Sequence, residues 1–233
     1  MDEKYDLNLK WQELWQPRSN AVGALSPNDR EIDRVFQLLV TAYTQPDRHY
    51  HNLQHIHHVL TILDRFVERL QNPMSVILAA WFHDFVYDSR STDNEIQSAK
   101  LAGEFLQNIG VPRETIDRVQ QLILATQGHQ PKIDDNDLCI FLDADLAILG
   151  TDPAQYQIYA RSIRREYSWV SDELYREGRN RVLESFLQRD SAKRRLRQRL
   201  YHTELLFDEL ESRARLNLQQ EILSNNCQVE ISL

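Results

Sequence analysis

The residues best suited to chemistry are a histidine and an aspartate, His83 and Asp84, inside an otherwise apolar run at residues 76–87. Two further candidates, His55 and Asp145, lie in similarly apolar surroundings. Buried imidazoles and carboxylates lose their hydration, so they are normally paired or bound to a metal. Both groups suit a divalent metal at a hydrolytic site, and the lack of cysteine in the set argues against structural zinc. We therefore predict one metal site made of these four residues.

Helical spacing separates Asp145 from its neighbour Asp143. The residues at helical spacing from Asp145 are leucines, namely Leu138, Leu142 and Leu149. Asp143 points about 200° away on the same helix, so the two acids cannot reach one ion without distortion. We expect Asp145 to be buried and to bind the metal. Asp143 is expected to contact the metal ligands without binding the ion itself, or to bind a second metal.

The same spacing distinguishes His55 from His57. The residues that follow His55 are apolar (Val59, Ile62 and Phe66), whereas those that follow His57 are polar, so we expect His57 to face water. A single histidine on an apolar face is more often a hydrogen-bonded core residue than a ligand, and a single buried aspartate is often a cap or an ion-pair partner. Four such residues together favour a metal site over those structural roles.

Helix start signals recur along the chain, whereas strand signals are scarce. Ser26-Pro27 and Asp152-Pro153 each place a capping side chain before a proline, and Thr92 and Glu95 have the spacing of a capping box. We therefore predict an all-α fold. The expected helices span about 4–16, 27–44, 52–71, 74–88, 93–109, 112–127, 135–149, 152–169, 172–189 and 192–223, the last broken once.

Composition predicts one globular domain over residues 1–223, with a frayed tail at 224–233. The two cysteines, Cys139 and Cys227, have no paired spacing, which is typical of a protein from the reducing cytoplasm. The N-terminus is acidic, and no apolar run approaches the roughly 18 residues of a membrane helix. A net charge of −8 disfavours binding to nucleic acid polymers, although a local basic patch could bind a small anion.

The order His55, His83-Asp84, Asp145 resembles the H…HD…D signature of the HD-domain superfamily of metal-dependent phosphohydrolases. Four segments are similar to a bacterial branch described only as predicted HD-superfamily phosphohydrolases: 50–56, 81–88, 93–95 with Ser98, and 143–150. The resemblance covers about residues 30–200. It implies an HD-type helical bundle with additional N- and C-terminal helices. The four residues would hold one divalent ion, manganese first, with magnesium, cobalt, iron, zinc and nickel as alternatives.

Asp88 is the candidate catalytic acid. It follows Asp84 by four residues, one turn along the same face of the expected helix, so it could orient a water molecule or relay its proton. Alternatively, Asp88 ends the helix near Ser89-Arg90. In alarmone-hydrolysing HD enzymes an acidic pair occupies this stretch, and Tyr87 here replaces the first of the two, which argues against an alarmone substrate.

Three arginines, Arg161, Arg164 and Arg165, are candidates for binding a substrate phosphate, because guanidinium groups bind phosphate through paired hydrogen bonds. The alternative is a solvated helix face with acidic partners such as Glu166. Three further residues could assist the metal ligands or bind a second metal: His51, Glu95 and His129. Glu95 is otherwise explained as a capping residue.

Three classes of function fit these residues. The favoured one is a cytoplasmic phosphohydrolase that cleaves a phosphoester of a nucleotide or another small phosphorylated metabolite through a metal-activated water. A di-iron HD-type oxygenase is the second, and it would need additional histidine or carboxylate ligands. The third is a non-catalytic, metal-containing module that binds a ligand. The intact set of four ligands argues against that module, since a sensor has less need of an open metal site.

Overall fold

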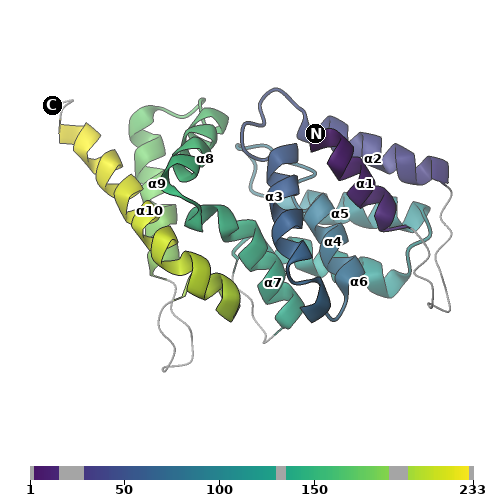
Figure 1. Cartoon of the computed structure of the whole chain (residues 1–233). Coiled ribbons are helices and arrows are strands. Elements are labelled where there is room, and N and C mark those ends of the chain that lie inside the picture. The colour runs from purple at the N-terminus through teal and green to yellow at the C-terminus, as the bar shows by residue number, and fades with distance from the viewer. Residues whose placement is uncertain (1–2, 16–28, 130–134, 189–198, 231–233) are drawn as a thin grey trace. The chain divides into compact units, whose positions relative to one another are not determined.

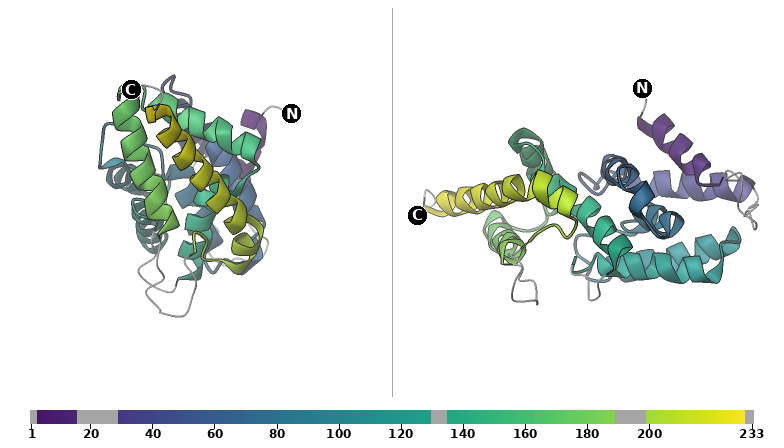
Figure 2. Two further views of the ribbon diagram at one scale, coloured as in Figure 1. Left: turned by 90° about the vertical axis from the view of Figure 1, so that its left-hand side faces the viewer. Right: turned by 60° about the horizontal axis from the view of Figure 1, so that its bottom comes forward.

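The structure is a computed structural model that describes residues 3–15, 29–129, 135–188 and 199–230. Over these ranges the regular secondary structure is helical and contains no strand (Figures 1 and 2), which confirms the all-α class. The helices are α1 (Glu3–Glu13), α2 (Asp29–Tyr43), α3 (Leu53–Asp64), η1 (Val67–Arg69), α4 (Pro73–Phe82), α5 (Asn94–Asn108), α6 (Arg113–Ala125), α7 (Asn136–Asp145), η2 (Leu146–Gly150), α8 (Pro153–Glu166), α9 (Asp172–Leu187) and α10 (Glu204–Glu230).

The chain packs as two compact units, Met1–Leu142 and Asp143–Leu233. The boundary falls within α7, so the first residues of that helix belong to unit 1 and the last three to unit 2. Two packing units can form one folding domain, so the single domain over residues 1–223 stays a prediction. The HD-type arrangement of the helices also stays a prediction.

Helix α4 lies in the core of unit 1 because its sequence is apolar on every side. It begins at Pro73, after Asn72, whose side chain accepts a hydrogen bond from the amide of Ser75. Its last residues, Trp81 and Phe82, are fully buried. The Trp81 ring meets the edge of another buried tryptophan, Trp11 of α1, at a centroid distance of 5.4 Å. This packing fixes the end of α4, and His83 follows directly.

Several helix ends differ from the predicted ones. Helix α4 ends at Phe82 rather than near residue 88, and α3 and α7 are each followed by a short 3-10 helix where a continuous α-helix was expected. Asp93, not Thr92, is the residue before α5, and its carboxylate accepts a hydrogen bond from the Gln97 side chain. The predicted capping box of Thr92 and Glu95 is therefore wrong. The expected start at Ser26-Pro27 lies outside the described residues.

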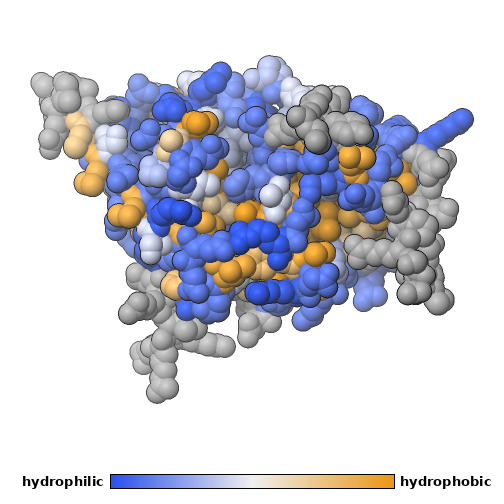
Figure 3. Space-filling model, in the orientation of Figure 1, coloured by the Kyte–Doolittle hydropathy of each residue, from blue (hydrophilic) through white to orange (hydrophobic). Residues whose placement is uncertain are grey.

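Unit 2 is organised around α10, which packs against η2 and α9, while α8 packs against η2. Gly150 lies so close to this helix that an added Cβ would be 2.5 Å from the Cβ of Leu210. Helix α10 continues without a break to Glu230, so residues 224–230, expected to be frayed, are helical. Leu216 and Leu223 of α10 are exposed, and Figure 3 shows apolar residues along this helix.

Candidate metal centre

Short-range capping positions the two histidines of the site. The side chain of Asn52 accepts hydrogen bonds from the amides of Gln54 and His55, so α3 begins at Leu53, two residues before His55. His83 directly follows the last residue of α4, and its amide still donates a hydrogen bond to the carbonyl of Ala79. The two side chains are therefore held by the first turn of one helix and the last turn of another.

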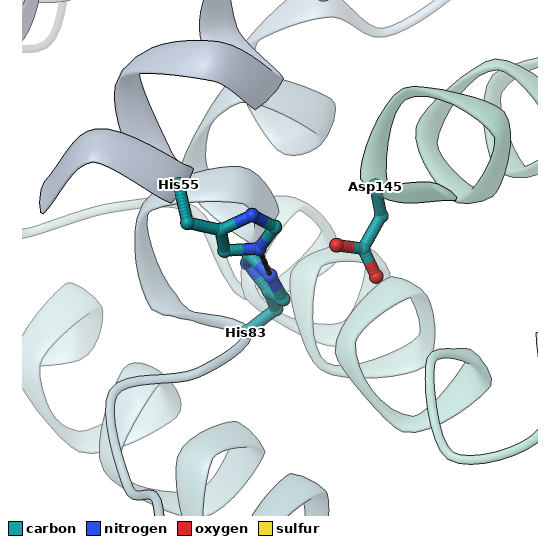
Figure 4. A group of neighbouring side chains, drawn as sticks. All are labelled: His55, His83 and Asp145. Carbon is teal, nitrogen blue, oxygen red and sulfur yellow. Dashed lines mark hydrogen bonds between the residues drawn. The ribbon is translucent and has the colours of Figure 1, made fainter. Parts of the chain in front are cut away.

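The rings of His55 and His83 meet inside unit 1. Both side chains are buried, with relative exposures of 4% and 1%, and their Nε2 atoms lie 3.0 Å apart (Figure 4). The Asp84 carboxylate joins them, since its Oδ2 atom is 3.0 Å from Nε2 of His83 and 3.4 Å from Nε2 of His55. Two imidazole nitrogens and a carboxylate oxygen thus converge on one point.

A backbone carbonyl fixes the tautomer of His83. Nδ1 of His83 lies 3.0 Å from the carbonyl oxygen of Ala80, which can only accept a hydrogen bond, so Nδ1 carries the proton. In the neutral ring, Nε2 therefore presents a lone pair to the Asp84 oxygen, which is also an acceptor. Two acceptors at 3.0 Å repel each other unless a proton or a cation lies between them. A metal-binding histidine is oriented in this same way by a hydrogen bond at its other nitrogen.

The surrounding imidazoles shift the titration of Asp84. Burial raises the pKa of the Asp84 carboxyl, but the positive charges of His83 and His51 in their protonated forms, together with the hydrogen bonds that His55 and protonated His83 donate, outweigh it. The net effect holds the pKa of Asp84 well below its usual range. The carboxylate is therefore ionised in the state in which it acts as a metal ligand.

Asp145 completes the group of candidate ligands. It is the last residue of α7, and its carboxylate and the nitrogens of His55 and His83 offer ligand atoms that all lie within 4.8 Å of one another (Figure 4). Its side chain is half-buried rather than buried as expected. Nitrogen and oxygen ligands of this kind fit a divalent ion, so the residues present are compatible with the predicted metal.

Asp143 is fully buried but serves a different contact. Its carboxylate accepts hydrogen bonds from the amides of His202 at 2.8 Å and Thr203 at 2.6 Å, just before α10 begins. Nδ1 of His202 lies 2.9 Å from the same carboxylate. Asp143 therefore anchors the start of α10, and the structure groups Asp145, not Asp143, with the histidines.

Arg48 is a buried residue that sequence reasoning missed. Its guanidinium donates to the carbonyls of Asp84 at 2.6 Å and Phe85 at 2.8 Å, and it lies over the rings of Tyr43 and Tyr87. These bonds hold the backbone that carries Asp84. An arginine between loop residues gives no sequence signal for such a role, because its partners lie 36 and 37 residues away.

Asp88 does not lie on a helix, so the premise for its catalytic role is wrong. Helix α4 ends six residues earlier, and the Asp88 side chain is 57% exposed. Its Oδ1 atom accepts a hydrogen bond from the amide of Arg90, while its own amide donates to Asn94. This arrangement is a side-chain-stabilised turn, so the alternative that Asp88 ends the helix is also wrong. Its catalytic role stays a prediction without helical support.

Besides Asp143, three residues were considered for a second metal, and of these His51 lies beside the site. Its ring stacks on Tyr87 at 4.1 Å and lies 5.9 Å from the His55 ring. Glu95 lies in the first turn of α5, and His129 follows α6 with a left-handed backbone angle. Within the described residues, the group that could hold an ion contains neither of these two.

The three candidate arginines are on α8 in unit 2, where they differ in environment. Arg164 binds Asp172 at 2.6 Å and the carbonyls of Tyr167 and Val170, so it closes the turn between α8 and α9. Arg161 and Arg165 are exposed. A role for these arginines at the metal site stays a prediction.

The sequence matches no protein-family model and no curated protein. The expected membership of the HD superfamily therefore stays a prediction that rests on the ordered motif. Within the described residues, no helix combines the length and the apolar character that crossing a bilayer requires.

Proposed function

We propose that this chain is a metal-dependent phosphohydrolase that cleaves a phosphoester of a nucleotide or another small phosphorylated metabolite. The observation that carries the proposal is the contact between His83 Nε2 and Asp84 Oδ2 at 3.0 Å, with the proton of His83 held on Nδ1. Such a contact favours a cation between the two groups. The order of the ligands in the HD motif supports phosphoester chemistry.

The proposed ligands are His55, His83, Asp84 and Asp145, with manganese as the first candidate ion. A bound divalent cation lowers the pKa of water and neutralises charge on a phosphoryl group. The protein keeps the ligands in an apolar environment, since the Phe141 ring lies 5.9 Å from the His83 ring and both residues are buried. Arg48 holds the backbone at Asp84, so the carboxylate is positioned before any ion binds. The proposal does not depend on Asp88.

The test is a hydrolysis assay on protein stripped with a chelator and reloaded with manganese, cobalt, magnesium or zinc. The substrates are a panel of nucleotides and small phosphoesters. We expect hydrolysis that the chelator abolishes and that one of the metals restores. Asp84→Ala should lower activity at least about 100-fold, because it removes a ligand rather than a supporting contact. The matched control is Asp208→Ala, which truncates an exposed aspartate of α10.

Metal content separates the alternatives. Stoichiometric manganese or cobalt without turnover on the whole panel would contradict the proposed hydrolase and favour a ligand-binding module. Two irons per chain with visible absorption would favour the di-iron oxygenase. Loss of activity in the Asp208→Ala control would show that the assay reports general damage.

A further inference from the structure

Helices α8, α9 and α10 of unit 2 surround a pocket of about 400 Å³. Each helix contributes residues at helical spacing from one face, such as Gln157 and Arg161 on α8, and Asn217 and Gln220 on α10. All lining residues belong to unit 2, and none is a candidate metal ligand. The volume lies within the range of pockets that bind small molecules, about 300–1,000 Å³.

One wall of the pocket is a buried hydrogen-bond network whose charged groups already pair with each other. Arg179 binds the Glu221 carboxylate through two nitrogens, at 2.8 and 3.2 Å, and the hydroxyl of Tyr156 donates to the same carboxylate at 2.5 Å. The other nitrogen partner of Arg179 is the hydroxyl of Tyr159 at 3.3 Å. The negative charge of Glu221 is therefore fully engaged within the wall and does not repel an anion in the pocket.

The rest of the lining carries surplus positive charge. Three arginines line the pocket, and with the buried Arg179 they make four guanidinium groups against the two carboxylates of Asp172 and Glu221. Arg164 is bound to Asp172. Among the described residues, Arg161 makes no hydrogen bond or ion pair, and Nε of Arg176 is buried without a hydrogen-bond partner. The surplus is therefore carried by Arg161 and Arg176, on facing helices.

Tyr175 adds a neutral donor to the same pocket. Its hydroxyl is buried and has no hydrogen-bond partner among the described residues. Burial raises the pKa of Tyr175 to about 12, so the hydroxyl keeps its proton and can donate it in a hydrogen bond. A buried donor without a partner is unfavourable, and a ligand oxygen would satisfy it.

From this arrangement we infer that the pocket of unit 2 is a binding site for a small molecule with a phosphate monoester group, contacted by Arg161, Arg176 and Tyr175. A phosphate monoester carries about two negative charges near neutral pH, which match the two surplus guanidinium groups, whereas a simple carboxylate carries one. Guanidinium groups also bind phosphate oxygens in pairs. This inference goes beyond the proposed hydrolysis, because no residue of the pocket takes part in metal binding.

The test is a calorimetric titration of the full chain, treated with a chelator so that the metal site cannot contribute. The probe is adenosine 5′-monophosphate, with adenosine and acetate as comparison ligands. We expect saturable binding of the monophosphate, and at least tenfold weaker binding of adenosine and of acetate. Arg161→Gln and Arg176→Gln should each weaken binding of the monophosphate by about tenfold or more, since each removes a charge-assisted contact.

Arg181→Gln is the matched control, because Arg181 lies on the same helix as Arg176 and is exposed but does not line the pocket. Its affinity should stay within about twofold of the wild-type value, while Tyr175→Phe should weaken binding by roughly threefold to tenfold. Equal affinities for the monophosphate and adenosine, no saturable binding, or equal losses in Arg176→Gln and Arg181→Gln would each overturn the inference. Because the titration is metal-free, its outcome is independent of the hydrolysis assay.

Discussion

The two units bury polar groups in opposite ways. In unit 2, Arg179 and Glu221 pair through two hydrogen bonds, and the hydroxyls of Tyr156 and Tyr159 complete the network. In unit 1, His83 Nε2 and Asp84 Oδ2 face each other at 3.0 Å, and neither carries a proton when His83 is neutral. The first network balances its own charges. The second is balanced only when an imidazole is protonated or a cation is bound.

This difference distinguishes polar groups that are buried for stability from polar groups that are buried for function. A network in which every donor meets an acceptor can be explained by stability alone, although it commonly contributes less than a well-packed apolar core. A pair of acceptors that face each other is balanced only by an added proton or a cation, so a cluster that contains such a pair is suited to a metal. The comparison predicts that changes in the Arg179–Glu221 network act on folding, and that changes at His83 and Asp84 act on metal binding.

The largest effect is expected from Arg179→Met, which leaves the Glu221 carboxylate buried without its partner. The free energy of unfolding should fall by about 3–5 kcal/mol, the usual loss when one member of a buried pair is removed. Urea denaturation followed by circular dichroism measures this. The control is Arg181→Met, which removes an exposed ion pair with Glu177 and should change stability by less than about 1 kcal/mol. Equal losses of unfolding free energy in the two variants would contradict the special role of the buried Arg179–Glu221 pair.

Metal addition should stabilise the wild-type protein and not the Asp84→Ala variant. At a free metal concentration of about 100 times Kd, binding to the native state alone adds about 2.7 kcal/mol to the free energy of unfolding. Thermal melts with and without manganese test this, together with elemental analysis. A variant that keeps stoichiometric metal and the full stabilisation would show that Asp84 is not a ligand.

The two acids of α7 should respond differently to the same substitution. Asp145→Asn should remove the metal, because it replaces a candidate ligand. Asp143→Asn should retain the metal but lower the free energy of unfolding by about 1–2 kcal/mol, since the carboxylate accepts the amides that precede α10. Metal analysis and denaturation of both variants give the answer. Similar metal loss in both would contradict the assigned roles.

Arg48→Lys should weaken metal binding by roughly tenfold to 100-fold, the usual effect of removing a supporting contact. A lysine cannot donate to the carbonyls of Asp84 and Phe85 in the forked geometry of the guanidinium. Competition with a chelator of known affinity measures the change. Wild-type affinity in this variant would mean that the backbone at Asp84 is held without Arg48.

The smallest effect is expected from Asp88→Asn. Asparagine keeps the oxygen that accepts the Arg90 amide, so the turn should form and stability should change by less than about 0.5 kcal/mol. Turnover on the substrate found by the panel should remain close to wild type. A fall of about 100-fold or more with the metal retained would restore Asp88 to the catalytic role expected from the sequence.

The sequence predicted those features that depend on local periodicity. The apolar run before His83 is long enough to predict a buried helix, and helical phase selected Asp145 over Asp143. The end of α4 was not predictable in this way, because the apolar residues continue through Tyr87. Arg48 binds the carbonyls of Asp84 and Phe85 and replaces the helical partners of those groups. The contact of Arg48 with these carbonyls joins residues that are distant in sequence, so no local pattern predicts it.

The hydrogen bond between His83 Nδ1 and the carbonyl of Ala80 links protonation to helix length. The last carbonyls of a helix lack the amides of a following turn, and here one of them instead selects the tautomer of a side chain. If α4 were one turn longer, that carbonyl would have a backbone donor and the imidazole would lose its restraint. A substitution that extends the helix would thus alter the affinity for a cation without changing any residue that binds it.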